Sequence, residues 1–124
     1  MIRLSLVIAT YNRAEQLMTT LRSVAEQSPP ATEWECVVVD NNSKDDTRHR
    51  VEIFCAEHPA LQLRYLFEER QGLSYARNAG IAASCGEVVA FIDDDERIVE
   101  DFVAAYIDLF AEYPEAMAAG GKIV

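Results

Sequence analysis

Four largely apolar runs recur along this chain of 124 residues, and each is followed by polar residues and then by an amphipathic stretch. Alternation of this kind predicts a parallel β-sheet whose strands are joined by helices. Strands with few polar residues are typical of sheets that are covered on both faces. We therefore expect an α/β, Rossmann-like domain over residues 1–124, with helices on both faces of a parallel sheet. The expected strands are 4–9, 36–39, 61–67 and 88–92, and the expected helices are 12–24, 43–55, 73–84 and 99–110.

The charge balance argues against several classes of partner. The chain has 11 Lys and Arg against 21 Asp and Glu, a net charge of −10, whereas nucleic acids and anionic lipids bind clustered basic side chains. No apolar run approaches the roughly 20 residues that cross a bilayer. The three cysteines, Cys36, Cys55 and Cys85, form no Cys-x-x-Cys pair, so we expect free, buried thiols in a reducing compartment. This predicts a cytoplasmic protein, with the inner face of a membrane as the alternative location.

Local motifs predict where the helices begin and end. Asn12 with Glu15, and Ser43 with Asp46, have the spacing of capping boxes, so each pair is expected to start a helix. Gly86 is expected to end the third helix, because glycine readily adopts the backbone conformation found just after a helix.

Polar residues follow each expected strand. In open parallel sheets, ligands bind beyond the carboxyl ends of the strands, so these segments are the candidate site. They are 10–13 (Thr-Tyr-Asn-Arg), 40–43 (Asp-Asn-Asn-Ser), 68–72 (Glu-Glu-Arg-Gln-Gly) and 93–95 (three aspartates).

The three adjacent aspartates carry the strongest single signal. Carboxylates this close repel one another, and a proton, solvent or a cation must offset the repulsion. In an extended segment, Asp93 and Asp95 point the same way and Asp94 points away from them. Two carboxylates suit Mg²⁺ or Mn²⁺, and such an ion commonly takes further ligands from a diphosphate. The alternative is a solvated acidic loop that precedes the next helix.

The other strand ends each allow two interpretations. Tyr11 either stacks on a nucleobase or packs against the protein, and Asn12 either contacts a ligand or only caps a helix. Asp40 either accepts a hydrogen bond from a base N–H or only forms a turn. Gly72 permits close approach of a backbone, and the small residues after it let the third helix lie close to the sheet. Arg77 is either a partner for the acidic cluster or a solvated helix residue.

Together, these segments resemble the N-terminal half of a family 2 glycosyltransferase with the GT-A fold. Four motifs occur in the order and spacing of that family, and they cover essentially the whole chain. They are Val7 to Arg13, Val37 to Ser43, Gly72 to Gly80 with its Ala-Arg-Asn-x-Gly core, and Phe91 to Asp95.

The resemblance implies a transferase that moves a sugar from a nucleotide-diphosphate sugar, expected to be a UDP-sugar, to an acceptor with inversion at the anomeric carbon. It implies that Asp95 ligates Mg²⁺ or Mn²⁺, that Asp93 contacts the ribose or metal-bound water, and that Asp40 reads a uracil-like N–H. The residues that the resemblance implies for nucleotide-sugar binding are Thr10, Tyr11, Asn12, Arg13, Asp40, Asn42, Gly72, Arg77, Asp93 and Asp94, and those for the metal are Asp93 and Asp95.

Domains of this family continue well beyond the Asp-x-Asp motif, and the continuation holds the acceptor site and the catalytic base. We therefore expect the base to lie beyond residue 124, since Glu115 is a poor candidate, and we expect this chain alone to be inactive. The alternative is a nucleotide-sugar-binding module or fragment without catalytic activity. The apolar segment 116–124 predicts an exposed sheet edge, and hence self-association as a two-fold dimer.

Overall fold

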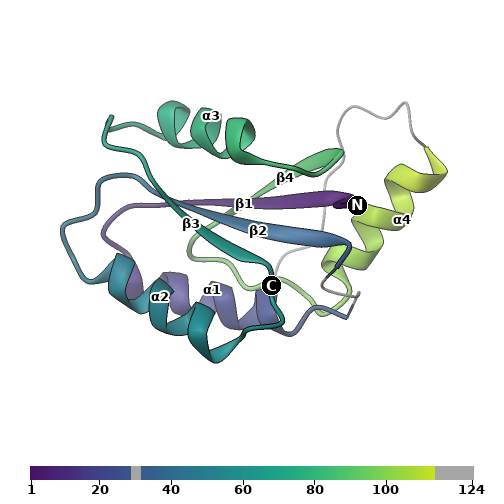
Figure 1. Cartoon of the computed structure of the whole chain (residues 1–124), viewed down its shortest axis with the longest axis horizontal. Helices are drawn as coiled ribbons and strands as arrows, with labels where there is room; N and C mark the ends of the chain where they lie inside the picture. Colours follow the sequence, from purple (N-terminus) through teal and green to yellow (C-terminus); the bar gives the residue numbers. More distant parts are fainter. Residues whose placement is uncertain (29–31, 114–124) are drawn as a thin grey trace.

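The computed structural model describes residues 1–28 and 32–113, and its centre is a four-stranded parallel sheet (Figure 1). The strands are β1 (Leu4–Thr10), β2 (Trp34–Asp40), β3 (Leu63–Phe67) and β4 (Val88–Asp93). They lie side by side in the order β3-β2-β1-β4, so that β1 and β2 occupy the middle. All residues of β2 and nearly all of β1 are buried, as expected for strands that are covered on both faces.

Helices cover both faces of the sheet, as predicted (Figure 1). Alternate residues of β1 feed two cores: Leu6 and Ile8 pack in the larger core, and Val7 packs in the smaller one. Within the described residues, three helices contribute to the larger core, and α3 packs on the opposite face. The helices are α1 (Ala14–Ala25), α2 (Thr47–Glu57), α3 (Leu73–Ala83) and α4 (Phe102–Glu112).

The connection through α3 carries the chain from one edge of the sheet to the other. Strand β3 lies beside β2, whereas β4 lies on the far side of β1. The direction of chain progression therefore switches between β1 and β4, and their carboxyl ends lie together because Ala9 is aligned with Asp93. Doubly wound sheets bind ligands at such a switch point.

The predicted capping box of Asn12 and Glu15 is wrong. Asn12 has a left-handed backbone with φ of 51°, and its Oδ1 accepts a hydrogen bond from the backbone N of Lys44 at 2.7 Å. Helix α1 begins at Ala14, whose N–H donates to Oδ2 of Asp45 at 3.3 Å. A residue 31 positions away thus replaces the local cap.

The predicted capping box of Ser43 and Asp46 is also wrong. Helix α2 begins at Thr47, and Oδ1 of Asp45 accepts hydrogen bonds from the backbone N of Thr47 at 3.1 Å and from its hydroxyl. Burial by itself would raise the pKa of Asp45, but the hydrogen bonds from Thr47 and Ala14 outweigh it and lower that pKa. One carboxylate therefore serves the N-termini of two helices.

Gly80 sets how closely α3 approaches the sheet. A Cβ atom at Gly80 would lie 2.4 Å from Cγ1 of Val7, so only glycine allows this helix to pack at the observed distance. The expected helix end at Gly86 is wrong, because α3 ends at Ala83 with Ser84 as its C-cap, and Gly86 instead lets the chain pass close to the backbone of Ser5. The expected close packing of α3 on the sheet is confirmed.

The three cysteines are free, as expected, but they are not all buried. Cys36 is buried, Cys55 is half-buried, and Cys85 is exposed because it follows the last turn of α3. Burial raises the pKa of both the Cys36 and the Cys55 thiol. Glu115 and the segment 116–124 lie outside the described residues. Within residues 1–28 and 32–113, no helix is long and apolar enough to cross a membrane.

Candidate functional site

The loops that follow β1 and β2 are tied together by backbone and side-chain hydrogen bonds. The backbone N of Asn41 donates to the carbonyl oxygen of Thr10 at 2.8 Å. The backbone N of Asn12 donates to Oγ of Ser43 at 2.9 Å, beside the bond from Lys44 to Asn12 already described. These contacts hold the two strand ends in a defined position at the carboxyl edge of the sheet.

A cavity of about 340 Å³ opens at this edge. Its lining combines polar groups from the β1 and β4 ends with the first turn of α3. Tyr11 is 45% exposed there, so its ring is available to a ligand and is not packed in the core. The lining residues are Ala9, Thr10, Tyr11, Arg13, Asn41, Gln71, Gly72, Leu73, Ala76 and Asp94.

Asp94 is the buried carboxylate of this cavity. Its Oδ2 accepts a hydrogen bond from Oγ1 of Thr10 at 2.9 Å, and its Oδ1 lies 3.4 Å from Nη1 of Arg13. Its backbone carbonyl accepts from Oγ1 of Thr20 in α1 at 2.9 Å. Burial raises the pKa of the Asp94 carboxyl, although Thr10 and Arg13 act in the opposite direction. Asp94 thereby links the ends of β1 and β4 to helix α1.

The neighbouring carboxylates form a separate cluster. Asp93, Asp95 and Glu96 each offer an oxygen, and these oxygens all lie within 4.8 Å of one another. Asp93 and Asp95 thus lie in one cluster while Asp94 points to Thr10, as expected. The expected reason is wrong, because β4 ends at Asp93 and residues 94 and 95 form a turn instead of an extended segment. Nη1 of Arg13 lies 3.2 Å from Oδ2 of Asp95, so the cation beside the triplet is Arg13.

Glu96 is the member of the cluster that the sequence motif does not include. The adjacent Asp93 carboxylate, together with burial and Asp95, raises the pKa of Glu96 to about 7. Its Oε2 is buried and is the one side-chain nitrogen or oxygen atom in the described part of the chain that is buried without a hydrogen-bond donor beside it. Three hard oxygen donors and an unsatisfied buried oxygen fit Mg²⁺ or Mn²⁺, so the residues present suit the expected divalent ion.

Asn41 shapes another wall of the cavity. Its side chain is buried, and Nδ2 donates to the carbonyl oxygens of Glu68 at 3.2 Å and Arg70 at 2.7 Å. Its Oδ1 accepts from the backbone N of Gly72 at 3.0 Å, and its carbonyl accepts from Nε2 of Gln71 at 3.1 Å. Asn41 therefore fixes the loop between β3 and α3, which includes Gly72 with its positive φ of 141°.

Asp40 lies beside the cavity but does not line it. It is buried, and its Oδ1 accepts from the backbone N of Ser43 at 2.9 Å. Its Oδ2 accepts from the hydroxyl of Tyr65 in β3, and burial together with this bond raises the pKa of Tyr65. Asp40 thus closes a turn, as one of its two interpretations expected, and also ties β2 to β3.

The predicted residues divide into two groups. Thr10, Tyr11, Arg13, Gly72 and Asp94 line the cavity, whereas Asn12, Asp40, Asn42, Arg77, Asp93 and Asp95 do not. Asn42 has a positive φ of 67° and accepts a hydrogen bond from Nζ of Lys44. The guanidinium of Arg77 lies 5.6 Å from the centre of the exposed Phe91 ring, so its partner is an aromatic side chain of β4.

Sequence reasoning missed three polar residues of this region. Asn41 and Gln71 lie within the polar segments that follow the strands, but their residue types gave no sign that they would face the cavity. Glu96 directly follows the acidic triplet, and that adjacency was the available signal.

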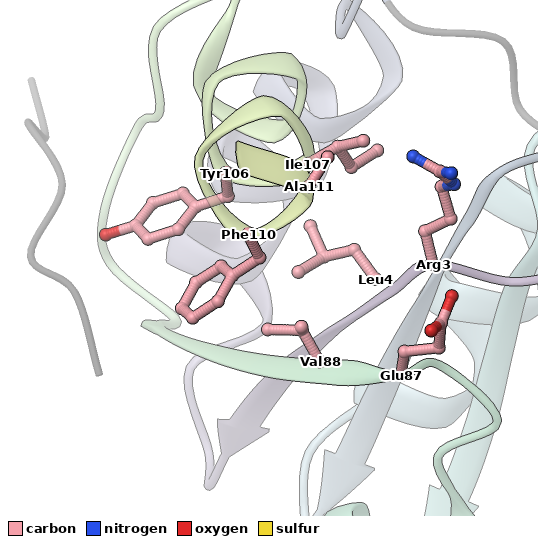
Figure 2. Close-up of a pocket in the computed structure, with 8 residues that line it drawn as sticks. All are labelled: Arg3, Leu4, Glu87, Val88, Tyr106, Ile107, Phe110 and Ala111. Atoms are coloured by element: carbon pink, nitrogen blue, oxygen red, sulfur yellow. The ribbon is translucent and has the colours of Figure 1, made fainter. Parts of the chain in front are cut away.

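A second cavity, of about 200 Å³, lies at the amino ends of β1 and β4 against α4. Figure 2 shows Tyr106 and Phe110 of α4 beside Leu4 and Val88 of the two strands. Within the described residues, the only cluster of potential metal-ligating side chains is at the opposite edge of the sheet. The candidate site is therefore the carboxyl edge.

Residues 5–124 match the sequence profile of glycosyl transferase family 2. The chain belongs to that family. A curated relative of this family 2 chain is the glucosyl-dolichyl phosphate glucuronosyltransferase of Haloferax volcanii, which is 32% identical over 124 residues. The match covers 98% of the chain and 38% of the relative.

Solved structures give the same result for the fold of this family 2 chain. The mannosyltransferase PcManGT from Pyrobaculum calidifontis, in complex with GDP-Man and Mn²⁺, matches with a TM-score of 0.83 and 32% identity over 88% of this chain and 32% of that one. Staphylococcus aureus TarS 1-349 in complex with UDP-GlcNAc matches with a TM-score of 0.83 and 27% identity over 98% of this chain and 37% of that one. The fold is the GT-A fold, and the chain spans less than two-fifths of each of these proteins.

Proposed function

We propose that residues 1–124 are the nucleotide-sugar-binding part of an inverting, metal-dependent glycosyltransferase that uses a UDP-sugar. The observation that carries this proposal is the cavity of about 340 Å³ next to the carboxylate cluster, at the switch point between β1 and β4. A nucleotide diphosphate needs both features, because the nucleoside requires a concave site and the diphosphate requires a cation. The complexes of family relatives with UDP-GlcNAc and with GDP-Man and Mn²⁺ support it.

The chain's own residues suggest a division of roles. Tyr11 stacks on the base, because its ring is exposed at the cavity. Gly72 allows the nucleotide to approach the backbone of the loop before α3. Arg13 turns from Asp95 to the diphosphate, since its side chain is 50% exposed and can reorient at little cost.

Asp93 and Asp95 hold the divalent ion in this proposal. When bound, that ion neutralises the charge that develops on the leaving nucleotide diphosphate. Asp94 keeps Thr10 and Arg13 in position through the contacts described above. We propose that the catalytic base and the acceptor site belong to the continuation of the domain and that the chain alone does not transfer sugar.

Titration calorimetry of the chain with UDP in the presence of Mn²⁺ tests the binding function. We expect saturable binding that weakens several-fold with EDTA or with Asp95→Ala. Asp108→Ala is a matched control, because Asp108 is an exposed aspartate of α4 that is remote in sequence from the cluster. Unchanged affinity in both EDTA and Asp95→Ala would refute the metal role. The proposal expects this binding without sugar transfer by the chain alone, and transfer to an acceptor would show that a catalytic base lies within residues 1–124.

The base preference has its own test. Both oxygens of Asp40 already accept a hydrogen bond, but each oxygen has a second lone pair that a uracil N–H can use. Asp40→Asn should weaken the binding of UDP by about 1–3 kcal/mol, because the amide presents a donor where an acceptor is needed. The binding of ADP should be nearly unaffected. Equal losses for the two nucleotides would show that Asp40 only holds the turn and the β2–β3 contact.

A further inference from the structure

Glu96 lies directly after the acidic triplet and shares a cluster with Asp93 and Asp95. We infer that Glu96 is a third carboxylate ligand of the divalent cation, which lets the chain bind the cation before the nucleotide. The inference rests on the proposed function and extends it, because the motif-based assignment uses only Asp93 and Asp95.

The geometry of the cluster supports a shared ion. One oxygen from each of Asp93, Asp95 and Glu96 lies within 4.8 Å of the other two. Oxygens on opposite sides of Mg²⁺ are about 4.2 Å apart, because each is bound at about 2.1 Å. The three oxygens thus need to move by less than about 1 Å to coordinate one ion.

The second observation concerns the environment of Glu96. The side chain is half-buried and faces Asp93, and its Oε2 is a buried oxygen that receives no hydrogen bond from a donor group of the described residues. Arg13 pairs with Asp94 and Asp95, and neither contact reaches Glu96. A buried carboxylate oxygen without a partner costs free energy, and a cation held against it would remove that cost.

Three carboxylates change the expected order of binding. Mg²⁺ sites that rely on substrate phosphates commonly use one or two protein carboxylates, and they bind the ion together with the substrate. A third carboxylate supplies enough negative charge to hold the ion without the diphosphate. The expected result is therefore measurable Mn²⁺ binding by the chain alone.

The competing explanation is structural: a protonated Glu96 could simply donate a hydrogen bond to Asp93. Glu96→Gln separates the two, because the glutamine amide donates a hydrogen bond as a protonated glutamate does but is a poor ligand for a hard cation. Glu96→Asp keeps the charge and shortens the side chain by one methylene group, so it separates loss of reach from loss of charge.

Electron paramagnetic resonance of free Mn²⁺, in titrations of the chain without nucleotide, measures the affinity directly. We expect Glu96→Gln to weaken Mn²⁺ binding about tenfold or more, Glu96→Asp to weaken it by a smaller factor, and the urea midpoint of unfolding to remain unchanged. Glu100→Gln, an exposed glutamate four residues on, is the matched control and should bind like the parent chain.

Two outcomes would overturn the inference. Parent-like Mn²⁺ affinity in Glu96→Gln, with a large loss in Asp95→Asn, would leave the proposed function intact and remove Glu96 from the site. Failure of the parent chain to bind Mn²⁺ with or without UDP would overturn this inference and the metal-dependent function together.

Discussion

Glu35 joins three strands and the end of α3, and its replacement should destabilise the fold without affecting the candidate site. The carboxylate is 4% exposed and lies near the amino ends of the strands. Its Oε2 accepts hydrogen bonds from Oγ of Ser5 at 2.6 Å and from the backbone N of Cys85 at 2.7 Å. Its Oε1 lies 2.9 Å from Nη2 of Arg64 in β3. Ser5 in turn accepts from the backbone N of Gly86 at 2.8 Å.

The substitution Glu35→Gln retains the shape of the side chain but removes one acceptor. If the amide NH₂ faces Arg64, the cost is below about 1 kcal/mol, because that guanidinium is 46% exposed and can be hydrated. The bonds from Ser5 and Cys85 then change from charge-assisted to neutral, which costs about 1 kcal/mol each. The sum predicts a loss of about 2–3 kcal/mol in the free energy of unfolding.

Equilibrium urea unfolding at neutral pH measures this loss, with Glu52→Gln as the control. Glu52 also pairs with an arginine, Arg48 at 3.1 Å, but both side chains are mostly exposed. Glu52→Gln should therefore lower the free energy of unfolding by less than about 0.5 kcal/mol. Nucleotide affinity should be the same in Glu35→Gln and the parent chain. Equal effects of the two substitutions would refute the reasoning, because burial of Glu35 would then contribute nothing.

The pH dependence of the same variant has a definite sign. Burial alone would raise the pKa of Glu35, but the hydrogen bonds from Ser5, Cys85 and Arg64 outweigh it and lower that pKa below its usual value of 4.5. The unfolded chain therefore takes up this proton at a higher pH than the folded chain does. The stabilisation by Glu35 is complete above about pH 4.5 and decreases as the pH falls through the folded-state pKa. The parent chain and Glu35→Gln should accordingly converge in stability in acid.

Three further predictions concern packing, the cavity wall and self-association. Gly80→Ala should destabilise the fold by about 1–3 kcal/mol in urea unfolding, despite the better helix propensity of alanine, because the new methyl group meets Val7. Asn41→Asp should weaken UDP binding about tenfold and speed amide hydrogen exchange at Gly72, because a carboxylate cannot donate to the carbonyls that Asn41 contacts. Parent-like UDP binding would mean that the loop before α3 holds its shape without Asn41. Within the described residues, β4 is an edge strand with Phe91 41% exposed, so light scattering should detect a dimer, and a monomer at all concentrations would contradict this.

The sequence by itself determined the class of fold and the edge at which the site lies. A run of apolar residues predicts a strand that is buried on both faces. This prediction needs only the residue types along the run and no knowledge of what packs against them. The polar residues after those runs then had to meet, because parallel strands end at the same edge. The period of an extended chain predicted that Asp94 and its two neighbours point in opposite directions, but β4 ends at Asp93, and a turn at Asp94 and Asp95 produces this arrangement.

Only the tertiary structure decided which partner each polar side chain takes. Ala14 donates to Asp45 and Lys44 donates to Asn12, each across about thirty positions, and these bonds take the place of the capping box of Asn12 and Glu15. The capping box of Ser43 and Asp46 is replaced by the bonds from Thr47 to Asp45. Arg13, rather than Arg77, pairs with the acidic triplet, because α1 begins beside the end of β4 while Arg77 lies over Phe91. Asn41 and Glu96 joined the site for the same reason. A polar side chain can pair with any group of suitable chemistry, and the sequence contains several such groups. The packing of helices and strands determines which of these groups lies within reach.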